Sequence, residues 1–346
     1  MKVGQRERAY WKFMMQTLGN PDGNFNIKLW NGSCETSDKE EIEKLLEKFW
    51  REIVWKNPCE RNASSTHICT PDDGDLLMFD KITFKNKCNT IKNNKSVGVD
   101  NVPGEFIKYG GEHLHRLIYD IFKNMWDEAW VPDTWRESEA LLIHKGGRKA
   151  KTEINNYRPI ANISSLCKLF GACVNEELNL WLEREECFGR EQTGFRKNHN
   201  CSENIYIIRE LVEQSRSTIA KKKLFLGFLD IWKAFDRVDR PFLLQRLNDI
   251  GMGEKGTNVI EALYTNNKVK FKLPGGIKTE YLENNVGVRQ GCTISPTLFN
   301  IFIEELLHRL RSSNFGATLR DGKVTTIGYA DDIVLIADSE IGLQEF

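Results

Sequence analysis

Apolar side chains recur at helical spacing in several stretches of the chain, which predicts amphipathic helices that each bury one face. The first stretch follows the polar residues 37–41, which are typical of a helix start, with Glu41 at or near the third position of a capping box. The apolar residues of its predicted buried face are Ile42, Leu45, Leu46, Phe49, Trp50, Ile53 and Val54. Further helices are predicted over residues 79–91, 114–126, 166–182, 205–212 and 295–310, and another begins over 242–247.

Shorter apolar runs rich in β-branched and aromatic residues predict strands. The run over residues 224–230 has the composition of a buried strand. Residues 269–273 and 278–282 flank Pro274-Gly275-Gly276, which predicts a hairpin. A second hairpin is predicted around Tyr329-Ala330-Asp331-Asp332, and single strands over 139–143 and 158–161. Helices that surround a few strands and hairpins favour the α+β class.

The segments between these elements are polar and rich in turn formers. Residues 58–74 have the composition of a linker, which predicts that residues 1–75 form a peripheral helical extension and its connection. Residues 96–103 and 145–156 are predicted to be loops.

The overall composition is that of an ordinary globular protein, with 346 residues, 40% hydrophobic and 28% charged. The length allows roughly two to three units of domain size. Lys and Arg together number 49, as do Asp and Glu. A net charge of zero lacks the overall signature of a nucleic-acid binder, so any basic surface must be local.

The cysteines favour an intracellular protein with reduced thiols. There are nine of them, and no two form a C-x₂-C pair, so a disulfide framework or zinc finger is not expected. No run of about 18 apolar residues that could cross a membrane is present, nor a charged-then-apolar signal peptide.

Two adjacent carboxylates, Asp331 and Asp332, stand at the tip of the second predicted hairpin. Hard cations such as Mg²⁺ take carboxylate ligands and complete their shell with substrate phosphates, so the pair predicts metal-assisted phosphoryl or nucleotidyl transfer. Asp230 ends a predicted strand and supplies a third acid. Two-metal nucleotidyl transfer needs about three carboxylates around ions ~4 Å apart. By itself, Asp230 is also consistent with an acid that caps the turn after its strand.

A glycine-flanked segment, residues 287–291, precedes the helix predicted over 295–310. Glycines allow a nucleotide to approach the backbone closely, and Gln290 can donate to sugar or phosphate oxygens. Many loops before helices have a similar pattern, so this segment alone is not specific.

Six blocks in order along the chain resemble the reverse transcriptase of non-LTR (LINE-like) retrotransposons. They are residues 98–103, 156–160, 192–197, 228–236, 287–300 and 329–332. The resemblance covers about residue 75 onwards. It implies a right-hand polymerase with fingers over 76–223 and a palm over 224–346. The family's thumb and endonuclease would lie outside this sequence, which ends at Phe346, so we expect a fragment or truncated copy.

The resemblance also implies roles for particular residues. Asp230, Asp331 and Asp332 would bind Mg²⁺, with Mn²⁺ as an alternative ion, and Phe235 would exclude the 2′-hydroxyl. Gln290 would contact the incoming nucleotide. Arg158 and Lys145 would neutralise the triphosphate, and Arg196 would support the fingers or the template path. The expected partners are an RNA template with a DNA primer, and dNTPs. Nuclear residence is implied by the family only, and no oligomeric state is predicted.

Simpler interpretations stay open for two of these residues. Arg158 is also consistent with a strand-edge arginine paired with a surface acid, and Lys145 with a solvated lysine in a polar loop. The family usually has Pro where Thr293 stands, and we expect this change to loosen Gln290.

Two other functions compete with the leading one. One is a viral-type RNA-dependent RNA polymerase. The resemblance to that class would imply an acid five residues after the first metal ligand and a Gly before the Asp pair. Phe235 and Ala330 occupy these positions here and favour DNA synthesis. A non-catalytic nucleic-acid-binding remnant of a retroelement is the other alternative, because the thumb is missing while the active-site residues are intact.

Overall fold

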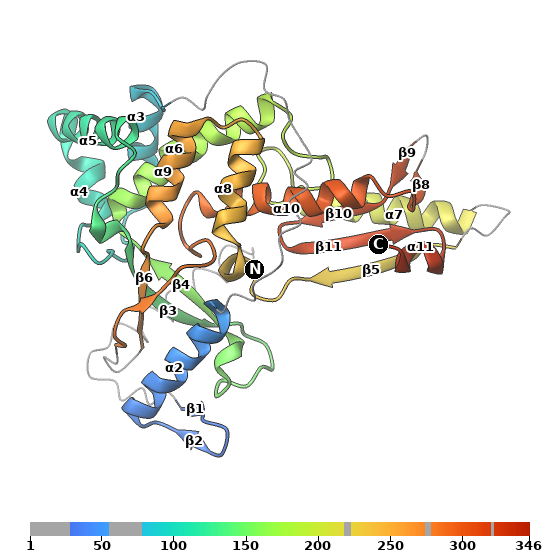
Figure 1. Ribbon diagram of the computed structural model, residues 1–346, viewed down its shortest axis with the longest axis horizontal. Helices are drawn as coiled ribbons and strands as arrows, with labels where there is room; N and C mark the ends of the chain where they lie inside the picture. Colours follow the sequence, from blue (N-terminus) through green and yellow to red (C-terminus); the bar gives the residue numbers. More distant parts are fainter. Residues whose placement is uncertain (1–27, 55–77, 218–222, 274–277, 320–321) are drawn as a thin grey trace.

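A computed structural model describes residues 28–54, 78–217, 223–273, 278–319 and 322–346 of the chain (Figure 1). It has the predicted mixture of helices and small sheets, so the α+β class is confirmed. The predicted linker over 58–74 and the turn at 274–276 lie outside the described residues. Within the described ranges, no helix is long and apolar enough to span a membrane.

Every predicted helix is present, most of them with longer bounds than the apolar pattern indicated. The helices are α2 (Lys39–Val54), α3 (Lys81–Thr90), α4 (Gly104–Tyr109), α5 (Gly111–Asp127), α6 (Ser165–Arg184), α7 (Cys201–Ser217), α8 (Arg240–Asp249), α9 (Glu254–Tyr264), α10 (Ser295–Arg311) and α11 (Glu340–Gln344). Three single turns of 3₁₀-helix are η1 (Asp133–Trp135), η2 (Ile154–Asn156) and η3 (Phe235–Arg237). The helices α4, α9 and α11 were not predicted. At the start of α2, the side chain of Asp38 accepts from the amide of Glu41 at 3.0 Å, as a capping residue does.

The strands of the described segments form four small sheets. Their bounds are β1 (Leu29–Trp30), β2 (Glu35–Thr36), β3 (Glu137–His144), β4 (Tyr157–Asn162), β5 (Phe225–Asp230), β6 (Lys268–Lys272), β7 (Leu282–Glu283), β8 (Ala317–Leu319), β9 (Gly322–Val324), β10 (Thr326–Tyr329) and β11 (Asp332–Ala337). The orders are β1-β2, β10-β11-β5, β4-β3-β6-β7 and β8-β9.

The four-stranded sheet joins segments that are far apart in the sequence. Strand β3 pairs antiparallel with β4 and parallel with β6. The predicted hairpin of β6 and β7 is confirmed, although β7 is only two residues long. Helix α2 packs its apolar face on this sheet, where Trp50 meets Phe271 edge-on at 5.5 Å between ring centroids. The N-terminal helix therefore shares a core with strands from the middle of the chain.

The three-stranded sheet is covered on both faces. Ile333 and Leu335 of β11 belong to the main core, together with residues of α10 such as Leu307. Ile336 faces the other way, into a smaller core that includes Leu211 of α7. Figure 1 shows α10 running beside β10 and α7 lying along the same sheet.

The prediction that residues 224–230 form a buried strand is wrong in one respect. The strand is present as β5, but Phe228 is 72% exposed, Leu229 is 42% exposed and Asp230 is also exposed. The reason is its position at the edge of the sheet, where β11 is its one strand partner among the described residues. The neighbouring core reaches Leu226 and ends there.

Candidate active site

The three candidate acids lie together at one end of the three-stranded sheet. Asp332 opens β11 and pairs directly with Asp230, the last residue of β5. Tyr329 pairs with Asp332, so Ala330 and Asp331 form a two-residue turn between them. Directly opposed residues on neighbouring strands point to the same face of the sheet. In Figure 1 this end of the sheet points toward the middle of the molecule.

The three carboxylates repel one another. Burial raises the pKa of Asp331 above its usual range, and the charges of Asp332 and Asp230 raise it further, while Arg158 opposes them. No three His, Cys, Asp or Glu side chains in the described segments converge closely enough to hold a metal ion as they stand. The set of oxygen donors nevertheless suits a hard cation such as Mg²⁺.

The charges of two basic residues act on the acids. Lys145, after β3, has its pKa lowered by burial and by the charges of Lys149 and Arg158, while Asp230 pulls the other way. The backbone amide of Lys145 donates to Asn156 at 2.8 Å, which fixes the base of its loop. Arg158 is exposed on β4. The structure thus brings both predicted triphosphate ligands near Asp230 and Asp331.

A third cation, Lys233, joins this group, although the sequence analysis gave it no role. Its Nζ lies 4.6 Å from the ring centroid of Phe49 in α2 and 3.4 Å from the carbonyl oxygen of Tyr157. Burial lowers the pKa of Lys233 to about 8, Lys145 and Arg158 lower it further, and Asp236 opposes them. The contact of Lys233 with Phe49 of α2 joins distant segments, and no local pattern predicts it.

Gln290 is held by a buried acid. Its Nε2 donates to Oδ2 of Asp236 at 2.9 Å, and its backbone carbonyl accepts from Ala161 at 2.7 Å. Burial raises the pKa of Asp236 to about 7. The Thr293 hydroxyl donates to the carbonyl of Lys168 at 3.0 Å and ties the loop to α6, and the expected loosening of Gln290 stays a prediction.

Phe235 is fixed by two other rings. It stacks on Phe299 of α10, with centroids 4.8 Å apart and planes 10° from parallel. Phe195 meets it edge-on at 6.0 Å. The half-buried ring therefore has one orientation beside the segment that carries Asp230.

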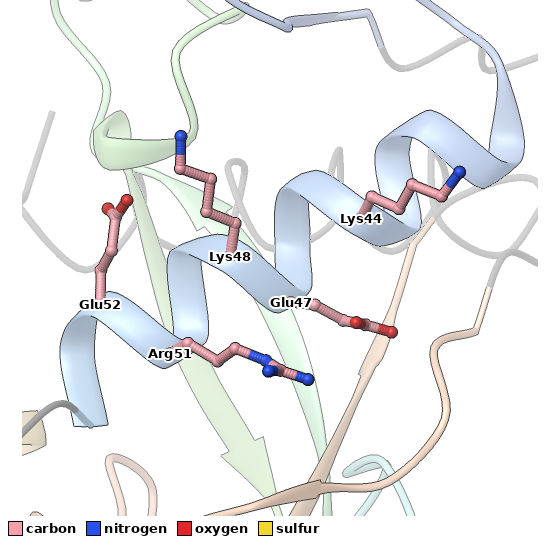
Figure 2. Close-up of a pocket in the computed structure, with 5 residues that line it drawn as sticks. All are labelled: Lys44, Glu47, Lys48, Arg51 and Glu52. Carbon is pink, nitrogen blue, oxygen red and sulfur yellow. The ribbon is translucent and has the colours of Figure 1, made fainter.

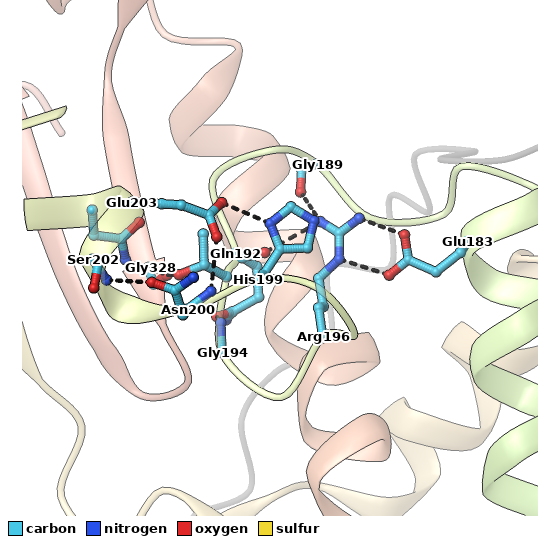
Figure 3. A network of polar contacts seen from close by, with 12 residues as sticks. Glu183, Gly189, Gln192, Gly194, Arg196, His199, Asn200, Ser202, Glu203 and Gly328 are labelled. Carbon is cyan, nitrogen blue, oxygen red and sulfur yellow. Dashed lines mark hydrogen bonds and ion pairs between the residues drawn. The ribbon is translucent and has the colours of Figure 1, made fainter. Parts of the chain in front are cut away.

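Arg196 is engaged within the fold by one carboxylate and two backbone carbonyls. Its Nε and Nη2 donate to the two carboxylate oxygens of Glu183 at 2.9 and 2.7 Å. Its Nη1 donates to the carbonyls of Gly189 at 2.7 Å and Gln192 at 3.2 Å (Figure 3). The geometry places Arg196 as a support of the 189–192 turn. Gln192 itself, which lies against the hairpin, received no role from the sequence.

A hollow on the surface of α2 lies apart from these residues. It has a volume of about 520 Å³, and Figure 2 shows the charged residues of α2 that line it: Lys44, Glu47, Lys48, Arg51 and Glu52. None of the candidate residues lines it. Alternating charges along one helix face are typical of a solvated surface.

Comparison with known proteins assigns the chain to a family. The pattern of the reverse transcriptase (RNA-dependent DNA polymerase) family matches residues 143–346, which is more than half of the chain. The chain belongs to the reverse transcriptase family. The family is one of enzymes, and the resemblance to non-LTR retrotransposon reverse transcriptases, predicted from the six blocks, is confirmed.

Several relatives of this reverse transcriptase segment come from mobile elements. It is 29% identical over 262 residues to the transposon TX1 uncharacterized 149 kDa protein of Xenopus laevis, which covers 73% of the chain and 19% of the relative. It is 25% identical over 270 residues to the RNA-directed DNA polymerase from mobile element jockey of Drosophila melanogaster, a match that covers 76% of the chain and 28% of the relative. It is 32% identical over 233 residues to the retrovirus-related Pol polyprotein from the type-1 retrotransposable element R2 of Nasonia vitripennis, a match that covers 67% of the chain and 22% of the relative. The chain thus spans less than a third of each of these relatives.

Proposed function

We propose that this chain carries the polymerase centre of an RNA-directed DNA polymerase that extends a DNA primer along an RNA template with dNTPs. The observation that carries the proposal is the pairing of Asp230 with Asp332 beside Asp331 in a chain of the reverse transcriptase family. Residues 76–223 would form the fingers and 224–346 the palm, with 1–75 as an extension.

The acids would hold the metal ions. Asp230, Asp331 and Asp332 would bind Mg²⁺, or Mn²⁺ as an alternative. When bound, such ions neutralise developing charge and favour the deprotonated 3′-hydroxyl. The gathering of three like charges at one end of the sheet supports this assignment.

The basic residues would bind the other end of the nucleotide. Lys145 and Arg158 would contact the triphosphate, and Lys233 would add positive charge beside them. Fixed cations around phosphate oxygens stabilise the charge that builds up during transfer. Gln290 would contact the incoming nucleotide while Asp236 holds its amide, and Phe235 would lie under the sugar.

The test is primer extension on an RNA template with the full chain. Asp331→Asn keeps the size of the side chain and removes its charge, and we expect the extension rate to fall at least about 100-fold. Asp338→Asn, which changes an exposed acid just after the other end of β11, is the matched control and should leave the rate unchanged.

The outcomes separate the alternatives. Equal extension by wild type and Asp331→Asn would refute the assigned role of the acid. Binding of primer and template by the wild type without any extension would instead favour the non-catalytic remnant. Extension with rNTPs in preference to dNTPs would favour an RNA polymerase.

A further inference from the structure

We propose that Gln192 is a positioning residue for the catalytic hairpin, an inference that rests on the proposed function of Asp331 and Asp332. The side-chain amide of Gln192 holds both backbone polar groups of Ala330, the residue immediately before the acid pair. Gln192 lies in the segment 191–194, more than a hundred positions before the hairpin in the sequence.

The contacts use both ends of the amide. Oε1 of Gln192 accepts from the amide of Ala330 at 2.8 Å and from the amide of Gly194 at 2.9 Å. Nε2 donates to the carbonyl of Ala330 at 3.1 Å. Gln192 is fully buried, so these bonds form in the absence of competing water. Only a side chain that both donates and accepts at this length can make all three.

The backbone at Ala330 explains why a clamp is needed. Its φ is +59°, in the left-handed region that glycine adopts readily and alanine does not. A non-glycine residue in this region persists when the surroundings over-determine its conformation. The two hydrogen bonds from Gln192 supply that constraint at the first of the two turn residues. Asp331 is the second turn residue, so its direction depends on the conformation of Ala330.

The neighbours of Gln192 hold the strand that leads into the turn. The amide of Gly328 donates to the carbonyl of Glu191 at 2.8 Å, and the carbonyl of Gly328 accepts from the amide of Thr193 at 3.1 Å. The same carbonyl accepts from the hydroxyl of Thr193 and from Nδ2 of Asn204 at 3.2 and 3.0 Å. Figure 3 shows Gln192 and Gly194 close to Gly328 of β10.

Gly194 allows the close approach. A Cβ at this position would lie 2.3 Å from the amide nitrogen of Ala330, so only glycine fits. Its carbonyl accepts from Nδ2 of Asn300 on α10 at 2.8 Å, which anchors the segment to the main core. The segment thus connects α10 to the turn that carries the acids, and it can set where the carboxylates stand.

The test compares variants of the full chain by three measurements. These are hydrogen exchange of the amides in 326–332, direct titration with Mn²⁺ as the probe ion, and primer extension. Gln192→Met keeps the volume and removes all three hydrogen bonds. Gln192→Glu keeps the acceptor for Ala330 and Gly194 but loses the donor, and it serves if Gln192→Met does not fold. Thr257→Val removes a buried hydroxyl with two partners near the start of α9 and is the matched control.

We expect Gln192→Met to accelerate exchange in 326–332 and to weaken Mn²⁺ binding, each by at least about tenfold. Thr257→Val should change neither, even where it lowers the melting temperature. Ala330→Gly in the Gln192→Met background should restore part of the Mn²⁺ affinity, because glycine adopts the turn conformation without the clamp. General loss of stability would not be rescued in this way.

Unchanged exchange and Mn²⁺ affinity in Gln192→Met would overturn the proposal, whatever happens to extension. A Gln192→Glu chain that behaves as wild type would overturn the requirement for the donor. If the exchange and Mn²⁺ results are as expected but the wild type never extends a primer, the clamp stands and the proposed polymerase function fails.

Discussion

At the scale of single residues, uncharged aromatic side chains pack beside the segment that carries Asp230. Phe235 lies five positions after Asp230, stacks on the core ring of Phe299 and meets the more exposed ring of Phe195 edge-on. Stacked and edge-on aromatic pairs have defined geometries, so the ring is a rigid surface. A rigid ring beside the nucleotide sugar is suited to exclude a 2′-hydroxyl.

Phe235→Ala should therefore weaken sugar discrimination. We expect the ratio of kcat/KM for a dNTP to that for the matching rNTP to fall at least about tenfold, because the space left by the ring accepts the extra hydroxyl. Single-nucleotide extension with each substrate measures the ratio. Phe242→Ala removes a ring on α8 that packs edge-on against Phe302 and should leave the ratio as it is. An unchanged ratio in Phe235→Ala would refute the gate role.

At the scale of elements, the loop that carries Gln290 is fixed by a buried arginine. Arg240 at the start of α8 donates to the carbonyls of Gly287 at 2.8 Å, Tyr264 at 2.7 Å and Val286 at 3.2 Å. Its guanidinium carbon also lies 5.1 Å from the ring centroid of Tyr264. Gly287 has a φ of +79°, and a Cβ there would lie 2.5 Å from the carbonyl oxygen of Asp236, so η3 and the loop approach closely. One side chain thereby connects three elements.

Arg240→Lys should destabilise the chain even though it keeps the charge. A lysine ammonium has three donors on a flexible stem and cannot replace the planar fork that reaches several carbonyls. We expect the free energy of unfolding to fall by about 2–4 kcal/mol, measured by urea denaturation. Arg209→Lys on the exposed face of α7, where the pair with Glu213 is solvated, is the control. It should change the same quantity by less than about 0.5 kcal/mol, and equal effects of the two substitutions would contradict the argument.

At the scale of the whole molecule, α10 is joined to the turn before the Gln192 segment by a buried acid. Glu304 accepts from the amide of Gly189 at 3.0 Å and from both terminal nitrogens of Arg311 at 3.4 Å. Arg311 also donates to Glu191 at 2.6 Å. Burial raises the pKa of Glu304 from 4.5 to about 7, and the contacts with Gly189 and Arg311 only partly offset it. The folded chain thus keeps a proton that the unfolded chain releases.

The stability of the whole chain should depend on pH through this group. Between pH 4.5 and about 7 the folded state binds the Glu304 proton and the unfolded state does not, so the free energy of unfolding falls as pH rises through this window. Glu304→Gln should remove a decrease on the order of 3 kcal/mol. Urea denaturation at a series of pH values measures it. Glu112→Gln, at an exposed acid, should keep the slope of the wild type, and a Glu304→Gln chain with the same slope would show that the proton lies elsewhere.

The sequence by itself determined the family, most of the helices and the choice of the three candidate acids. These features are local. The apolar residues of a helix repeat at a regular spacing within the helix itself, and the acid pair lies within a single hairpin. The order of the six blocks adds information that no single motif has, and the match over residues 143–346 confirms the family. The roles of the individual residues, from Asp230 to Arg196, stay predictions that the experiments above test.

The tertiary structure alone decided which distant residues meet. Two contacts join segments that are far apart in the chain: the parallel pairing of β3 with β6, and the contact of Lys233 with Phe49. The exposure of β5 likewise follows from its place at the edge of a sheet. Gln192 also contacts a distant segment, and its own block of sequence carries no sign of its partner Ala330. A window of sequence contains one side of such a contact, and the energy of the contact depends on both. The turn that carries Asp331 is therefore predictable from its own residues, whereas the clamp on Ala330 appears only when the chain is folded.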